Sequence, residues 1–137
     1  MVLLKEADVE KAIRHYLRDK GFKLEQKSNK GVDIRANKLG YTLFVEVEGN
    51  ARNKRDPLKS RSARYTHFYR CVGQICARMG EGNEKSRYAI GLPDDDKYRE
   101  YVGKVRKAFE LLDVNVLWVH ENNTVRVEMT GRAQLGL

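Results

Sequence analysis

The amino-acid sequence predicts an α/β domain in which helices flank a mixed central sheet. The prediction depends on alternating apolar strands, amphipathic helices, and an element order that reads αβββ, then αβ, then αββ. Strands joined by tight turns pair antiparallel, whereas strands joined through a helix pair parallel, so both pairings are expected in one sheet. We expect the 137 residues to form a single domain, 1–137, because no repeat or linker interrupts the pattern.

The first part of the chain contains a helix followed by three strands. Apolar residues recur at helical spacing over residues 6–20, and Gly21 ends that pattern. Alternating or short apolar runs, separated by turn residues, predict the strands. These strands cover residues 22–26, 32–37 and 41–48.

The rest of the chain begins with a polar segment, residues 49–64, which is predicted to be a loop. After it we expect a helix, a strand, a helix and two strands over residues 65–80, 87–93, 95–112, 114–120 and 124–129. Pro93 closes the strand before it, and Asp94 is the predicted N-cap of the next helix. The last hairpin, with Trp118, is a predicted sheet edge and therefore a candidate homodimer surface.

The composition indicates a polyanionic partner and no membrane span. The net charge is +8 and the isoelectric point is about 9.6, values typical of proteins that bind nucleic acid. Cys71 and Cys76 lie five residues apart on a predicted helix, which suits neither a disulfide nor a zinc pair, so both are interpreted as small core residues. The opening MVLL is too short for a signal peptide, and a cytoplasmic location without a membrane partner is expected.

Three acidic residues form the candidate site. Glu46 and Glu48 share one face of the strand 41–48, and Asp33 begins the preceding strand. If these strands form a hairpin, the three carboxylates meet at one edge, where Mg²⁺ would offset their repulsion. The alternative is a solvated face on which lysines or arginines pair with the acids.

The order of elements and the position of the acids resemble the PD-(D/E)xK nuclease superfamily, also called restriction-endonuclease-like. GVDI supplies Asp33 and FVEVEG supplies Glu46, which match the Asp and the (D/E) of that signature. The first helix, ending in DKGF, is similar to that of archaeal Holliday-junction resolvases and carries Glu10 at the matching position. CVGQICARM supplies Gln74, with Arg78 one turn later, and the resemblance extends over about residues 5–92.

The resemblance implies a restriction-endonuclease-like αβββαβ core with an additional C-terminal helix and hairpin. It also implies Mg²⁺-dependent hydrolysis of DNA phosphodiester bonds, with Mn²⁺ as a substitute metal. The implied metal ligands are Asp33, Glu46 and Glu10, with Glu48 as a further candidate. The implied catalytic residues are Asp33, Glu46, Glu48 and Gln74.

One position departs from the signature, because Glu48 stands where the family has lysine. That lysine is associated with activation of the attacking water and with charge at the phosphate. Two replacements stay open: Lys30, just before Asp33, and the basic residues that follow Glu48.

Basic residues concentrate directly after Glu48 and continue along one face of the next helix. Such a run, next to acids, suits a segment that grips phosphates, although a solvated loop or a subunit contact would also explain it. The candidate nucleic-acid-binding residues are Arg52, Lys54, Arg55, Lys59, Arg61, Arg64, His67, Arg70 and Arg78.

Two classes of function follow. The first is a metal-dependent DNA nuclease. The second is a catalytically inactive nucleic-acid-binding module, or a subunit of a larger restriction or recombination complex, and Glu48 in place of lysine keeps this alternative open.

Overall fold

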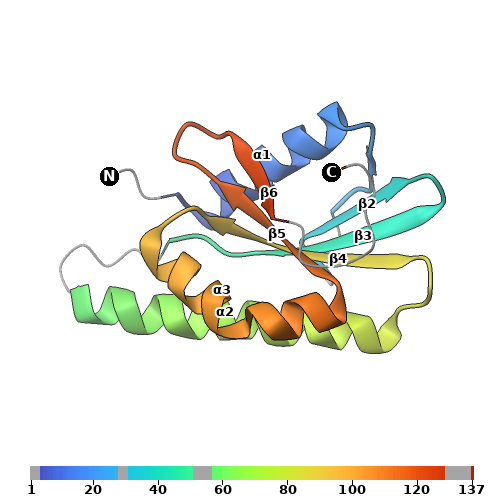
Figure 1. Ribbon diagram of the computed structural model, residues 1–137. Helices are drawn as coiled ribbons and strands as arrows, with labels where there is room; N and C mark the ends of the chain where they lie inside the picture. Colours follow the sequence, from blue (N-terminus) through green and yellow to red (C-terminus); the bar gives the residue numbers. More distant parts are fainter. Residues whose placement is uncertain (1–3, 28–30, 51–56, 129–136) are drawn as a thin grey trace.

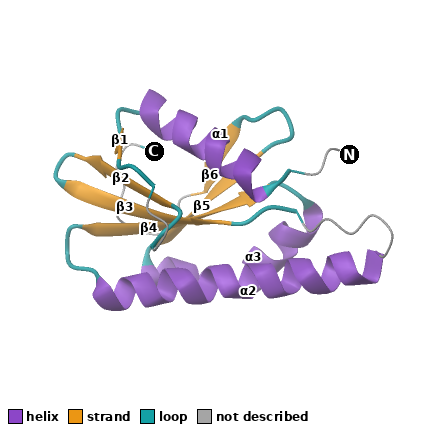
Figure 2. Cartoon of the chain, turned by 180° about the vertical axis from the view of Figure 1, so that it is seen from behind, coloured by secondary structure: helices purple, strands orange, loops and turns teal. Residues whose placement is uncertain are grey.

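Six strands form one mixed sheet, with α1 on one face and α2 and α3 on the other (Figures 1 and 2). The computed structural model describes residues 4–27, 31–50, 57–128 and 137, and for residues 57–62 it describes the backbone. The helices are α1 (Glu6–Asp19), α2 (Pro57–Glu81) and α3 (Asp96–Leu112). The strands are β1 (Lys23–Leu24), β2 (Ile34–Lys38), β3 (Tyr41–Val47), β4 (Ser86–Pro93), β5 (Val114–Val119) and β6 (Val125–Glu128).

The strands lie in the sheet in their sequence order, β1 to β6. β3, β4 and β5 pair parallel through the crossover helices α2 and α3, and the remaining neighbours pair antiparallel. The predicted mixed α/β sheet and the predicted order of elements are therefore confirmed. Parallel pairing brings the carboxyl ends of β3, β4 and β5 to the same end of the sheet.

Alternation along β3 separates two buried clusters. Leu43 and Val45 pack with α1, whereas Phe44 packs in the cluster that contains residues of α2 and α3. Glu46 lies on the same face as Phe44 because side chains of a strand alternate with period two. The predicted division of this strand into an apolar face and an acidic face is thus present in the folded chain.

Two glycines allow α1 to lie close to the sheet. A Cβ atom on Gly91 would lie 2.2 Å from Cδ1 of Ile13, and one on Gly49 would lie 2.2 Å from the backbone nitrogen of Glu6. Leu4 and Asn50 join the two segments further, since the Leu4 amide donates to Oδ1 of Asn50 at 2.9 Å. The start of α1 is therefore attached directly to the carboxyl end of β3.

The structure corrects the predicted start of the second helix. α2 begins at Pro57, so residues 57–64 are helical and the predicted loop is wrong over that range. Proline suits the first position of a helix, where its fixed φ fits and the missing N–H costs nothing. The basic residues that follow are good helix formers, which the polar composition obscured.

Three further predictions are wrong. Cys76 is exposed while Cys71 is buried, because five residues on a helix carry the second thiol away from the core. Asp95, not Asp94, is the N-cap of α3, and its Oδ1 accepts a hydrogen bond from the Tyr98 amide at 2.9 Å. The last hairpin does lie at the sheet edge, since β6 is the last strand, but the expected exposure of Trp118 there is wrong: it is 1% exposed and packs under α3.

The helices of the described ranges include none that is long and apolar enough to cross a membrane.

Candidate active site

Asp33 and Glu46 face each other across the β2–β3 ladder. Ile34 pairs with Val45, so the next position outward sets Asp33 opposite Glu46. Oδ2 of Asp33 accepts a hydrogen bond from the Val47 amide at 2.8 Å, which turns this carboxylate toward β3. Burial, the charge of Asp33 and a hydrogen bond with Asp33 together raise the pKa of Glu46 to about 7.

Glu48 is buried beside a cation of α2. Its side chain is 4% exposed, and Oε1 accepts a hydrogen bond from Nη2 of Arg70 at 3.1 Å. Burial raises the pKa of Glu48 to about 7 in spite of this contact. His67 Nδ1 lies 3.9 Å from Oε2 of Glu48, and burial and the charge of Arg70 lower the pKa of its ring, which disfavours the protonated form that an ion pair requires.

A pocket of about 210 Å³ opens beside Glu46. Gln74 and Arg78 line it from α2, and Gly31 lines it from the segment before β2. Nε of Arg78 lies 3.6 Å from Oε1 of Glu46, and the guanidinium remains 27% exposed. The structure thus brings Glu46, Gln74 and Arg78, three residues expected in the site from the sequence, to one solvent-accessible depression.

Glu10 lies in ion pairs of its own. Its carboxylate contacts Nε of Arg14 at 3.0 Å and Nζ of Lys27 at 2.7 Å. Nη2 of Arg14 also donates to the backbone carbonyl of Asp33 at 2.8 Å. Glu10 is therefore linked to Asp33 through Arg14, and two cations occupy the carboxylate that was expected to bind metal.

Glu6 is the acid of α1 that sequence reasoning missed. Partial burial and the charge of Asp33 raise its pKa, and Glu6 in turn contributes to the raised pKa of Glu48. Its position in the first turn of α1, next to Gly49, explains this closeness. No sequence signal indicated it, because the contact depends on how α1 lies against the end of β3.

Arg35 was also missed, although a signal was available. It follows Asp33 by two positions on an extended segment, so both side chains lie on the same face. Its guanidinium lies over the ring of Phe44 at 5.0 Å, and Asp33 and Arg35 line a second pocket of about 200 Å³ together with Arg14 and Lys27. Cations therefore lie on both sides of the Asp33–Glu46 pair.

Asp33 and Glu46 are the two carboxylates that fit a shared Mg²⁺ ion. No group of three or more His, Cys, Asp or Glu side chains within the described ranges is arranged to hold a metal ion. Two carboxylates remain, Asp33 and Glu46, and Mg²⁺ usually binds through one or two carboxylates while it keeps several waters. Burial and, after it, the charge of Asp33 raise the pKa of Glu46, and a bound cation would favour the ionised carboxylate again, so this pair fits the ion.

The basic run is only partly described. Arg52, Lys54 and Arg55 lie outside the described residues, and of Lys59 and Arg61 only the helical backbone is described. Arg64 is turned inward, with Nε 3.9 Å from Oδ2 of Asp95 and its side chain 15% exposed. Lys30, one proposed replacement for the family lysine, also lies outside the described residues.

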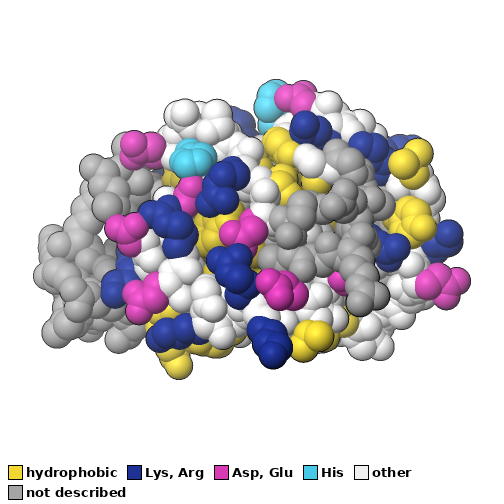
Figure 3. All heavy atoms as spheres, viewed as in Figure 1, with side chains coloured by type: hydrophobic (Ala, Val, Ile, Leu, Met, Phe, Trp, Pro, Cys, Tyr) yellow, Lys and Arg dark blue, Asp and Glu magenta, His cyan; other side chains and the backbone are white. Residues whose placement is uncertain are grey.

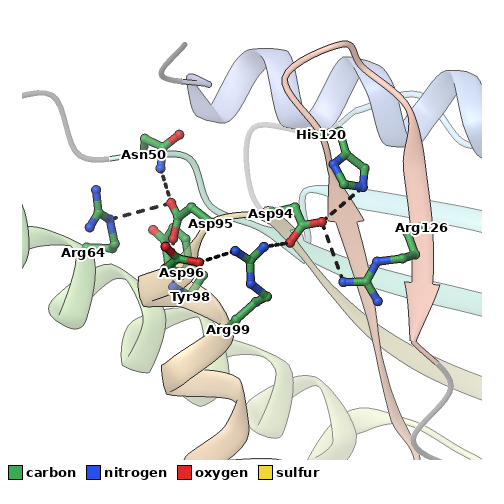
Figure 4. A network of polar contacts seen from close by, with 9 residues as sticks. All are labelled: Asn50, Arg64, Asp94, Asp95, Asp96, Tyr98, Arg99, His120 and Arg126. Atoms are coloured by element: carbon green, nitrogen blue, oxygen red, sulfur yellow. Dashed lines mark hydrogen bonds and ion pairs between the residues drawn. The ribbon is translucent and has the colours of Figure 1, made fainter. Parts of the chain in front are cut away.

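The three consecutive aspartates form a polar network of their own (Figure 4). Oδ2 of Asp94 lies 3.1 Å from Nε2 of His120 and 3.7 Å from Nη2 of Arg126, and Oδ1 contacts Arg99. Nδ2 of Asn50 donates to Oδ2 of Asp95 at 2.6 Å. These contacts join α3, the β5–β6 hairpin and the segment after β3, so the aspartates have structural partners.

No protein-family model matches the sequence, and no curated protein matches it significantly. The likeness to PD-(D/E)xK nucleases therefore depends on the order of the elements and on the residues named above.

Proposed function

We propose that this protein is a Mg²⁺-dependent nuclease of the PD-(D/E)xK type that hydrolyses DNA phosphodiester bonds. The observation that carries the proposal is that half-buried Asp33 lies opposite buried Glu46, whose pKa is raised by burial and by the charge of Asp33. The confirmed mixed sheet and element order are compatible with the restriction-endonuclease-like core that the proposal requires.

Each residue of the site has a role in this proposal. Asp33 and Glu46 hold the metal, and the Val47 amide keeps Asp33 turned toward Glu46. When bound, Mg²⁺ would lower the pKa of a coordinated water and neutralise charge on the phosphoryl oxygens. Gln74, exposed at the rim of the pocket, orients the water or the DNA backbone by hydrogen bonding.

Arginines take the place of the absent lysine in the proposed chemistry. Arg78 lies beside Glu46, and Arg70, with half of its side chain exposed, lies beside Glu48. Guanidinium groups stay charged and can bind two phosphate oxygens at once. Glu48 is then a positioning residue, because its carboxylate holds Arg70 toward the site.

The test is cleavage of labelled linear, supercoiled and branched DNA in Mg²⁺, Mn²⁺ or EDTA. Asp33→Asn and Glu46→Gln should each reduce the metal-dependent rate at least ~100-fold while DNA binding in EDTA persists, because the metal supplies most of the catalysis. Glu110→Gln, which changes an exposed acid of α3, is the matched control and should cleave normally. Cleavage that survives both site variants would overturn the proposal.

A second candidate function is a DNA-binding module without catalysis. The glutamate at position 48 favours this candidate, because the family has a lysine amine at this position. Here the position holds a carboxylate that pairs with Arg70. A folded protein that binds DNA in every condition but never cuts it would support this candidate. The same result is expected of a subunit that cuts only within a larger complex.

A further inference from the structure

The turn between β2 and β3 holds a bulky apolar residue in a conformation that suits glycine or asparagine. Leu39 has φ 54° and Gly40 has φ 81°, so both central residues of this two-residue turn are left-handed. Turns of this kind prefer Asn-Gly, and leucine is sterically disfavoured at positive φ. The Leu39 side chain is 81% exposed, so no burial within the described chain compensates for its conformation.

Cations flank this turn on the side of α1. Nζ of Lys38, the residue before Leu39, lies over the ring of Phe22 at 5.1 Å and donates to the backbone carbonyl of Lys20 at 2.6 Å. Lys23 of β1 pairs with Asn37 and is exposed beside the same turn. β1 and the turn thus place the amines of Lys23 and Lys38 on the side of the turn that faces α1.

Further cations flank the turn on the side of β4. Nζ of Lys85 lies 4.8 Å from the ring centroid of Tyr41, and Cζ of Arg87 lies 4.4 Å from it. Tyr41 follows Gly40 directly, so these two cations lie at the base of the turn. Aromatic rings hold them in place without neutralising their charge.

The cations beside the turn have no ion-pair partners among the described carboxylates. None of the cations named above forms an ion pair with a described carboxylate, whereas Arg99 and Arg106 on the α3 side do. Figure 3 shows acidic and basic side chains interspersed over α3, and mainly basic and hydrophobic side chains, with an acidic one beside them, at the end where Figure 1 places the β2–β3 turn. The cations beside the turn therefore have no direct ion-pair partner among the described carboxylates.

We propose that this end of the sheet is a second DNA contact, in which the cations bind backbone phosphates and Leu39 packs into the minor groove. We call it the hairpin surface; it comprises Lys23, Lys38, Leu39, Lys85 and Arg87. Uncompensated lysines and arginines gain affinity for DNA by releasing its counterions, and exposed apolar side chains are used as wedges in the minor groove. An exposed leucine in a disfavoured conformation is explained by such a contact.

The inference rests on the proposed function for the identity of its partner. Glu46 lies five positions after Tyr41 on β3, a distance of about 17 Å at roughly 3.3 Å per residue. That span equals about five base pairs of B-DNA, so one duplex can reach both the hairpin surface and the carboxylate pair. A lipid surface is the weaker fit, because a single leucine provides little apolar area for insertion.

The experiment measures binding of the full chain to a fluorescent 20-base-pair duplex in EDTA over a range of salt concentrations. Lys23→Gln/Lys85→Gln should weaken binding about 10-fold and reduce the slope of log K against log salt by about two, because roughly 0.9 counterions are released per contact. Leu39→Asn should weaken binding several-fold without a change in slope, since asparagine accepts the left-handed conformation. Lys104→Gln/Lys107→Gln on α3 removes two exposed charges and should bind like wild type.

The outcomes separate this inference from the proposed nuclease activity. Hairpin variants that bind the duplex like wild type overturn the inference, even if the enzyme cleaves DNA. Wild-type protein that binds through the hairpin surface but never cleaves supports the inference and removes the nuclease. Hairpin variants that keep duplex binding but lose binding to anionic vesicles or polyglutamate overturn it in favour of another partner.

Discussion

Asp33 and Glu46 lie opposite each other on adjacent strands, and burial of Glu46 together with the charge of Asp33 favours the protonated form of Glu46. The pKa of Glu46 is raised to about 7 by burial, by the charge of Asp33 and by the hydrogen bond between them. Arg78 lies at 3.6 Å from Glu46 and only partly offsets the repulsion. This pair governs both the chemistry proposed for the protein and its response to pH.

The stability of the metal-free protein should fall as pH rises from about 5 to about 8. In the folded chain the pKa of Glu46 and of Glu48 is about 7, against an ordinary value of 4.5. Between these values the folded state binds more protons than the unfolded state, so stability is highest below the unfolded pKa and is lost through the folded pKa. Urea unfolding should show a loss on the order of 1–2 kcal/mol per carboxyl, after allowance for solvent screening.

Mg²⁺ should restore part of the folding stability that is lost as pH rises. The effect should be larger at high pH, where the carboxylates are ionised. Glu46→Gln removes one acid of the pair, so this variant should respond less to both pH and Mg²⁺. Glu110→Gln should behave like wild type. Equal stabilisation of all three proteins by Mg²⁺ would mean that the ion binds elsewhere.

Removal of the Arg70 guanidinium should destabilise the protein by about 1–3 kcal/mol, because Glu48 would stay buried without its partner. Arg70→Gln should therefore lose more stability at about pH 8 than at about pH 5. The double variant Glu48→Gln/Arg70→Gln should recover most of the loss in a double-mutant cycle. Simple additivity of the two substitutions would show that the pair contributes no coupling.

Gly49→Ala should destabilise the protein by about 1–3 kcal/mol, the range for overpacking in a close-packed interior. The new methyl would lie 2.2 Å from the backbone nitrogen of Glu6, and backbone cannot rotate away as a side chain can. Gly73→Ala on α2 is the matched control, since no atom lies within 4 Å and helix propensity predicts a gain of about 0.5–1 kcal/mol. Thermal unfolding of both variants measures the difference, and equal effects would refute the close approach.

Asp95→Ala should cost about 0.5–2 kcal/mol, because it removes the hydrogen bond that caps α3. Asp96→Asn should have little effect, since its side chain is 96% exposed. Chemical denaturation distinguishes the two positions. A larger effect at Asp96 than at Asp95 would contradict the assignment of the cap.

The hydrophobic pattern was sufficient to predict most of the fold. The alternation in β3 and the helical spacing of Val9, Ile13 and Leu17 identified the faces that are buried. It failed at the start of α2, where Pro57 and a run of basic residues look like a loop although they satisfy the rules for a helix start. A polar surface helix has little apolar periodicity, so pattern reading placed its beginning too late.

The candidate site was predictable only in part. Period-two alternation was enough to predict that Glu46 and Glu48 lie on one face, and a hairpin was enough to bring Asp33 opposite Glu46. The same rule could have identified Arg35. It could not identify Glu6, whose charge interacts with Asp33 and Glu48, as a further acid of α1 near the site.

The sequence by itself determined the order of the elements and the faces that they bury, because local spacing of apolar residues decides both. Only the tertiary structure decided which charges meet. The way the helices lie on the sheet decides that Glu48 is buried beside Arg70 and that α1 approaches Gly49. It also decides that Glu10 pairs with Arg14 and Lys27. Electrostatic energies depend on distance and burial, and local sequence specifies neither.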